Sequence, residues 1–255
     1  MSARRRAAAL AACLALCGAG ARAGPYTERG YAPSEALAWA TAVDSFDRGP
    51  LDIANPGGGD ASFGAPENAL GPATNDVYDV FSLGDGGFIT FYVAGGIHDG
   101  PGDDFAVFEN GFYAPGGLYG ELAFVEVSSN GVDFVRFPAT CLRSTAVAGG
   151  GTIDPTDYHN LAGKHPLNRG TGFDLAELGL SSVSYVRLVD VIGNGSTFDA
   201  AGRKVYDPYP TAYASGGFDA DALAVPEPDP SAALAAGALA VSALALRRRP
   251  CAHSR

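Results

Sequence analysis

Short runs of alternating or continuous apolar residues, separated by glycine and proline, fill the middle of the chain. Outside the two ends, a helical spacing of apolar residues is found only over residues 34–43. Strand-like runs lie at residues 77–83, 88–93, 104–109, 122–128, 132–137, 185–192 and 220–225. Many short strands with turn residues between them are typical of an all-β sandwich or jelly roll. We therefore expect this fold, with a candidate short helix near its start.

The clearest local signal is a hairpin around the Asn-Gly pair at residues 130–131. Residues 125–128 and 132–135 alternate apolar and polar side chains, and Asn-Gly tolerates the positive φ angles of a tight type I′ turn. In contrast, residues 140–171 and 193–217 are polar and rich in glycine. We expect both stretches to be long loops outside the core, where binding residues usually lie.

The N-terminus follows another pattern. Basic residues 4–6 precede an apolar run at residues 7–19, and small residues follow at 21–23. This order predicts a secretory signal peptide over residues 1–23, which signal peptidase removes.

Near the C-terminus, an uncharged run of mainly Ala, Leu and Val spans residues 231–246 and is followed by Arg247, Arg248 and Arg249. The run predicts a transmembrane helix, and the positive-inside rule holds the arginines in the cytoplasm as a membrane stop. As a helix it is about 24 Å long, less than the roughly 30 Å of the hydrocarbon core. A short span suits a temporary anchor. The alternative is a buried, alanine-rich helix of a globular domain.

Val225, Pro226, Glu227 and Pro228 stand shortly before this run. A Pro-Glu-Pro motif followed by one apolar segment and an arginine cluster resembles the PEP-CTERM sorting signal of Gram-negative bacteria. The resemblance implies an exported protein that is anchored transiently in the inner membrane until an exosortase-type membrane protease cuts at the motif. It also implies a final place at the cell surface or in the extracellular matrix of biofilm-forming bacteria, with exopolysaccharide as a partner.

These signals divide the chain into a signal peptide (1–23), an N-terminal extension (24–61), a β-sandwich domain (62–225), the sorting signal (226–249) and a cytoplasmic tail (250–255). Only one of the four cysteines, Cys141, remains between the two signals. No disulfide can form within the body, so its stability must come from a hydrophobic core, which about 200 residues can build as one domain.

Without the two signals, the body is strongly acidic. Residues 24–226 contain nine of the 17 basic residues and 26 of the 28 acidic ones, a net charge of −17. This charge disfavours binding to nucleic acid or to anionic lipid headgroups. It suits solubility outside the cell and the capture of hard cations such as Ca²⁺.

Two groups of carboxylates are candidate metal ligands. Asp99, Asp103 and Asp104 lie among glycines that let the backbone curl, and Asp219 and Asp221 are spaced to leave the same face of a strand. Because Ca²⁺ takes six to eight oxygen ligands, either group is a candidate for structural Ca²⁺. The alternative for the first group is an acidic turn whose carboxylates cap backbone N–H groups.

Aromatic residues in the predicted loops are candidates for sugar binding, because their rings can stack on sugar faces. We select Tyr206, Tyr209 and Tyr213 for ligand binding, with Tyr113 and Tyr119 as further exposed aromatics. The alternative is that these side chains hold the loops against the sandwich.

The sequence gives little support for catalysis. It contains no metalloprotease motif and no nucleophile elbow. Glu109 and Glu121 satisfy the minimum requirement of a glycosidase, a pair of carboxyl groups, although acidic chains offer many such pairs by chance. We therefore assign no catalytic residue.

A second resemblance covers the body. Four segments occur in order: residues 63–71 (FGAPENALG), 81–90 (FSLGDGGFIT), 125–131 (VEVSSNG) and 185–188 (YVRL). They are similar to successive segments of discoidin-like and related carbohydrate-binding jelly rolls, although the terminal cysteine pair of some members is missing. The resemblance implies a discoidin-like jelly roll with long loops. We expect a non-catalytic binding or matrix protein associated with exopolysaccharide; the alternative is a polysaccharide-active enzyme that uses carboxylate catalysis.

Overall fold

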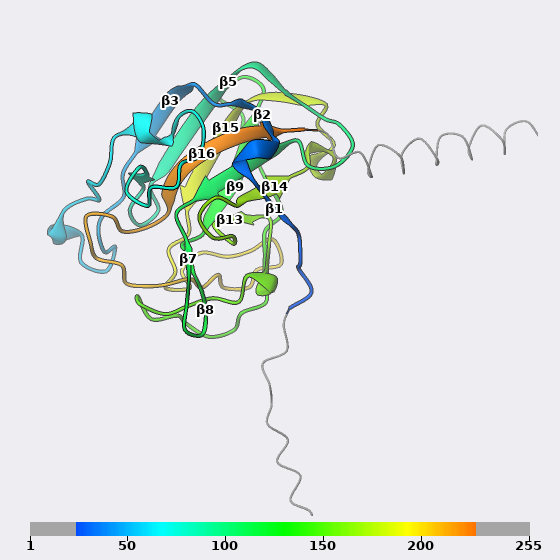
Figure 1. The fold of residues 1–255 in the computed structure, drawn as a ribbon. Helices are drawn as coiled ribbons and strands as arrows, with labels where there is room; N and C mark the ends of the chain where they lie inside the picture. Colours follow the sequence, from blue (N-terminus) through cyan, green and yellow to red (C-terminus); the bar gives the residue numbers. More distant parts are fainter. Residues whose placement is uncertain (1–23, 228–255) are drawn as a thin grey trace, which may run out of the picture.

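The computed structural model describes residues 24–227. Its main part consists of two antiparallel sheets (Figure 1). Sheet A has the order β1-β14-β6-β16-β2, with β4 also paired to β16; the strands are β1 (Gly30–Tyr31), β14 (Gly170–Phe173), β6 (Phe105–Glu109), β16 (Asp219–Pro226), β2 (Ala36–Trp39) and β4 (Phe81–Ser82). Sheet B has the order β10-β9-β15-β5-β3, with β13 also paired to β9; the strands are β10 (Val135–Arg136), β9 (Ala123–Ser128), β15 (Ser182–Asp190), β5 (Phe88–His98), β3 (Ala42–Asp47) and β13 (Leu161–Ala162).

Two short strand pairs and five 3₁₀ turns complete the described part of the chain. The pairs are β7 (Phe112–Ala114) with β8 (Gly117–Tyr119), and β11 (Thr140–Cys141) with β12 (Tyr158–His159). The 3₁₀ turns are η1 (Pro33–Glu35), η2 (Pro56–Gly58), η3 (Pro66–Ala69), η4 (Pro155–Asp157) and η5 (Leu175–Leu178). The described residues contain no α-helix, and the expectation of an all-β fold is confirmed.

Each of the seven predicted strands corresponds to an observed strand, but the lengths differ. β5 continues beyond the predicted end to His98, whereas β4 and β10 shrink to two residues each. Residues 77–80 precede β4 as turns, because the Asp76 carboxylate accepts a hydrogen bond from the Tyr78 N–H and draws the chain into a bend.

The short helix predicted at residues 34–43 is wrong. After η1, the chain forms β2, which pairs with β16, and then β3, which pairs with β5. The apolar residues of this segment have a helical spacing, but no helix forms. Pairing with β16 and β5 supplies backbone partners and apolar contacts that an isolated helix would lack.

The predicted domain boundary at residue 62 is corrected as well. Residues 24–61 are not an extension, because β1 and β2 belong to sheet A and β3 belongs to sheet B. The sandwich therefore begins near the start of the described chain, and β16 carries it to Pro226.

The main core lies between the sheets, where alternate residues of each strand point inward. Ile89, Phe91 and Val93 of β5 face Phe105 and Val107 of β6 within one buried cluster. The intervening residues of β6 belong to a second cluster on the outer face of sheet A, with Tyr31, Trp39 and Ala222. β6 is therefore buried on both faces.

The two stretches expected to be loops outside the core, residues 140–171 and 193–217, form a core of their own. Their apolar residues are few and scattered, yet they gather against the outer face of sheet B, beside Phe124 and Val189, in a third buried cluster. Its members include Cys141, Val147, Ile153, Tyr158, Leu161 and Val205. The expectation failed because these side chains lie far apart in the sequence without a strand-like period and meet only in the fold.

The predicted hairpin is present, but its turn is wider than expected. Val127 pairs with Val135, so the connection spans more than the Asn-Gly pair. Gly131 has a positive φ of 74°, whereas Asn130 has none, which excludes a type I′ turn. The side-chain carbonyl of Asn130 instead accepts hydrogen bonds from the N–H groups of Val132 and Asp133, both at 2.9 Å.

Several predictions concern residues outside the described part. These are the signal peptide at 1–23, Pro228, the apolar run at 231–246 and the membrane stop at Arg247, Arg248 and Arg249. Within residues 24–227, the longest helices are single 3₁₀ turns, and none has the length and hydropathy needed to cross a membrane.

The first residues of the predicted cleavage motif belong to the sandwich. Val225 pairs with Ala38 and the buried Pro226 pairs with Ala36, while the Glu227 N–H donates to the Glu35 carbonyl at 2.8 Å. The folded body thus extends into the motif itself.

Since β16 lies between β6 and β2, we expect sheet A to require it. A chain of residues 24–218 should lose cooperative thermal unfolding and become sensitive to proteases, whereas a chain of residues 24–227 should melt cooperatively. Circular dichroism during heating checks both. Similar melting temperatures for the two chains would contradict the central role of β16.

Candidate functional site

A pocket of about 320 Å³ lies beside the start of β16, and residues of β7 and β8 form part of its wall. This volume is at the lower end of the range for small-molecule sites, about 300–1,000 Å³. Four separate stretches of chain supply its walls: Phe63, Val77, Tyr78, Asn110, Phe112, Tyr119, Glu121, Thr211, Tyr213, Ser215 and Asp219.

Aromatic rings form much of the pocket wall. Phe112 stacks on Tyr119 with ring centroids 5.1 Å apart, and Phe63 lies 6.4 Å from Tyr78. Tyr78 and Tyr213 are 72% and 70% exposed, although such side chains usually bury their rings. The pocket therefore presents ring faces to solvent, where a ligand can stack on them.

Two acidic side chains lie deeper in the same pocket. Asp219 is 6% exposed; its carboxylate accepts hydrogen bonds from the Ser82 hydroxyl and, at 3.0 Å, from the Asn110 amide. Glu121 is 4% exposed, and its Oε1 has no hydrogen-bond partner among the described residues.

The environment of these two carboxyl groups favours their neutral forms. Burial raises the pKa of Asp219 to about 6. Burial, followed by the charge of Asp219, raises the pKa of Glu121 well above its usual value. The pocket therefore holds two acids that give up their protons less readily than surface carboxyl groups.

Two more carboxyl groups are buried near the same end of sheet A. Glu109 is 2% exposed and accepts a hydrogen bond from the Gly111 N–H at 2.6 Å, but it does not line the pocket. Asp221 is 2% exposed, neither of its oxygens has a side-chain hydrogen-bond partner among residues 24–227, and burial raises its pKa to about 7. Of Glu109 and Glu121, the two carboxyl groups considered for catalysis, only Glu121 lines the pocket.

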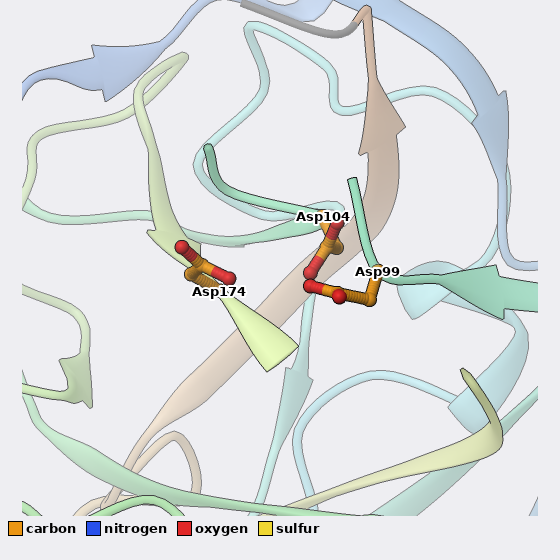
Figure 2. Close-up of side chains that lie close together, drawn as sticks. All are labelled: Asp99, Asp104 and Asp174. Carbon is orange, nitrogen blue, oxygen red and sulfur yellow. The ribbon is translucent and has the colours of Figure 1, made fainter. Parts of the chain in front are cut away.

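A second acidic cluster lies at the other end of β6. Oxygens of Asp99, Asp104 and Asp174 come within 4.8 Å of one another, and Figure 2 shows the three carboxyl groups turned toward a common space. Asp104 accepts hydrogen bonds from the N–H groups of Gly100 and Leu175, each at 2.7 Å, and burial raises its pKa to about 6. Asp104 and Asp174 thus cap backbone N–H groups, and together with Asp99 they could also hold a cation.

The predicted metal ligands are thus divided between two places. Asp99 and Asp104 lie before β6, whereas Asp219 starts β16 opposite the far end of β6, five residues or about 17 Å along the strand. Asp103 turns away from the first cluster toward the Tyr31 hydroxyl. Asp174 was not among the metal ligands predicted from the sequence. The pairing of Phe173 in β14 with Phe105 in β6 brings it beside Asp104.

The predicted ligand-binding tyrosines also separate. Tyr213 lines the pocket, as does Tyr119. Tyr209 donates a hydrogen bond from its hydroxyl to Asp52 at 2.5 Å, and Tyr206 packs against the third buried cluster. Tyr206 and Tyr209 therefore hold their loops against the sandwich, which was the alternative to ligand binding.

No protein-family model matches the chain, and no curated protein matches it.

The buried acids predict an unusual pH dependence. Their folded pKa values lie above the unfolded values, so their charging costs stability as the pH rises from about 4 through 7. We expect a higher melting temperature at pH 5 than at pH 8 when no divalent cation is added. Asp221→Asn should reduce this difference most clearly, by up to about 2.6 kcal/mol of stability between pH 5 and pH 8, since the pKa of Asp221 is raised from 3.8 to about 7 and one pKa unit is worth about 1.4 kcal/mol. The exposed Asp60→Asn is the matched control; an equal effect of both substitutions would contradict this role of Asp221.

Proposed function

We propose that the body is a non-catalytic glycan-binding module of an exported protein. The observation that carries this proposal is the pocket, in which five aromatic rings surround hydroxyl, amide and carboxyl groups. Aromatic faces stack on the C–H faces of sugar rings, while side chains such as Asn110, Thr211 and Ser215 suit hydrogen bonds to sugar hydroxyls. The loop position of the pocket, at one end of a two-sheet sandwich, supports the comparison with discoidin-like jelly rolls.

The proposed location follows from the two ends of the sequence. Signal peptidase would release the N-terminus, and an exosortase-type membrane protease would separate the body from a transient inner-membrane anchor. The end of the last strand at Pro226 supports this division, because β16 ends inside the proposed sorting motif. An exopolysaccharide at the cell surface or in the matrix would then be the partner.

A structural Ca²⁺ is a further part of the proposal. Asp99, Asp104 and Asp174 each bring one carboxylate oxygen within 4.8 Å of the others, and water would complete the coordination that Ca²⁺ requires.

The glycan proposal is tested by removing an exposed ring from the pocket wall. Tyr213→Ala should weaken binding to exopolysaccharide from the native host about tenfold, equivalent to about 1.4 kcal/mol. Tyr113→Ala is the matched control, because Tyr113 is also 70% exposed but does not line the pocket. Titration calorimetry or glycan-array binding gives the comparison. Equal affinities of the two variants would argue against the pocket, and no binding to any glycan would refute the function.

The calcium proposal is tested by one substitution under two conditions. Asn at position 174 can still accept the hydrogen bond from the Ala176 N–H that Asp174 accepts at 2.8 Å. In excess chelator, Asp174→Asn should raise the melting temperature because it removes a repelling charge. In millimolar Ca²⁺ it should lower the melting temperature, since a ligand stabilises only the fold that binds it. The same sign under both conditions would exclude a site at this cluster.

A glycan-active enzyme remains the second candidate, because Glu121 and Asp219 line one pocket and differ in their hydrogen bonding. A carboxylic acid and a carboxylate on either side of a glycosidic bond are the groups that hydrolysis requires. Release of reducing ends from exopolysaccharide, abolished by Glu121→Gln, would replace the non-catalytic proposal. We expect no turnover.

A further inference from the structure

Glu121, one of the residues that line the pocket, has a buried carboxyl oxygen without a hydrogen-bond partner among the described residues. Glu121 is 4% exposed, and its Oε1 accepts no hydrogen bond from any described residue. A buried polar atom is usually paired, because leaving it unpaired costs the solvation that it had in water. A ligand group that donates a hydrogen bond to Oε1 would therefore gain more here than at the surface.

The charge around this oxygen is of one sign. After burial, the charge of Asp219 raises the pKa of Glu121 most, followed by the charges of Asp207 and Asp190, while a hydrogen bond with the Thr211 side chain lowers it. The described residues that line the pocket include no arginine, lysine or histidine. Both oxygens of Asp219 already accept hydrogen bonds, from Ser82 and Asn110, so Asp219 adds negative charge but leaves Glu121 as the free acceptor. Burial favours the neutral forms of Glu121 and Asp219, and a ligand that brings a positive charge favours their ionised forms, so the pocket suits a cationic ligand better than a neutral or anionic one.

The walls favour the same kind of ligand. A cation is attracted to the face of an aromatic ring, and the attraction grows where water is excluded. Five rings surround the pocket: Phe63, Tyr78, Phe112, Tyr119 and Tyr213. A single free carboxyl oxygen among aromatic rings does not provide the six to eight oxygens that Ca²⁺ requires, so an organic cation fits better than a metal ion.

We propose that the pocket selects a sugar that carries a free, positively charged amine, an inference that rests on the proposed glycan-binding function. The ammonium group donates a hydrogen bond to Glu121 Oε1, and the sugar ring stacks on the aromatic wall. An acetylated amine loses the charge, and a uronic acid brings a carboxylate toward Asp219 and Glu121. The ligand class is thus a polysaccharide with de-acetylated amino sugars, and acidic polysaccharides are excluded.

The test compares three β-1,4-linked oligosaccharides of equal length, built from glucosamine, N-acetylglucosamine or glucose. The full chain, purified in detergent, is titrated with each by calorimetry at pH 6.5 and physiological salt. The glucosamine oligomer should bind at least tenfold more tightly than the other two. Equal binding of all three would overturn the selectivity and leave the glycan-binding function standing, whereas no binding of any of them would remove support from both.

A second measurement separates the pocket from the acidic surface as a whole. Glu121→Gln keeps the shape of the side chain and should reduce the preference for the glucosamine oligomer over the glucose oligomer to less than threefold. The control is Glu67→Gln, an exposed glutamate outside the pocket, which should keep the full preference. A general attraction of a cationic oligomer to the acidic body would survive Glu121→Gln, and that result would overturn the assignment. Melting curves of both variants verify that they are folded; the comparison of oligomers on the unchanged chain needs no variant.

Discussion

β16 lies between β6 and β2 in sheet A, and this pairing fixes the position of most groups discussed above. Pairing of Ala220 with Glu109 sets the register at one end of the two strands. Asp219 consequently lies beside Ser82 and Asn110, while the loop that precedes β16 brings Thr211, Tyr213 and Ser215 to the same pocket. A register shift between Ala220 and Ala222 places Asp221 at an irregularity, so the strand carries two buried acids without exposing its apolar residues. One strand pairing therefore builds both the central sheet and the acidic part of the pocket.

The concentration of buried acids is costly for a fold without disulfides. Glu109, Glu121, Asp219 and Asp221 are all less than 7% exposed, and no described base pairs with them. The buried Lys164 is paired instead with Glu28. Such groups are tolerated where the surrounding structure is over-determined, and they are concentrated at functional sites more often than elsewhere. Burial on both faces of β6 gives the sandwich the stability needed to hold them.

The strands that were predicted from the sequence are mainly those whose own residues favour an extended backbone. β5, β6, β9 and β15 combine β-branched and aromatic residues over five or more positions, so their local preference agrees with the fold. The local pattern was misleading where a pairing strand determines the structure. It predicted a helix for the segment that contains β2, which is extended because it pairs with the edge of β16. It also missed the third buried cluster, since isolated residues such as Val147 and Val205 show no period. The pocket was only partly visible: Glu121, Asp219 and Tyr213 stood out by type, but Phe63 and Phe112 carry no sign that they meet.

The place of β16 in the sheet also determines when the body can assemble. β3, β5, β9 and β15 of sheet B precede it in the chain and can pair without it. Sheet A cannot be completed at this stage, because β6 pairs with β16, which lies about 110 residues further along the chain. A polypeptide threaded across a membrane from its N-terminus would therefore stay open on one side until its final segment arrived. Arrival of the last strand would then be the event that triggers completion of the fold.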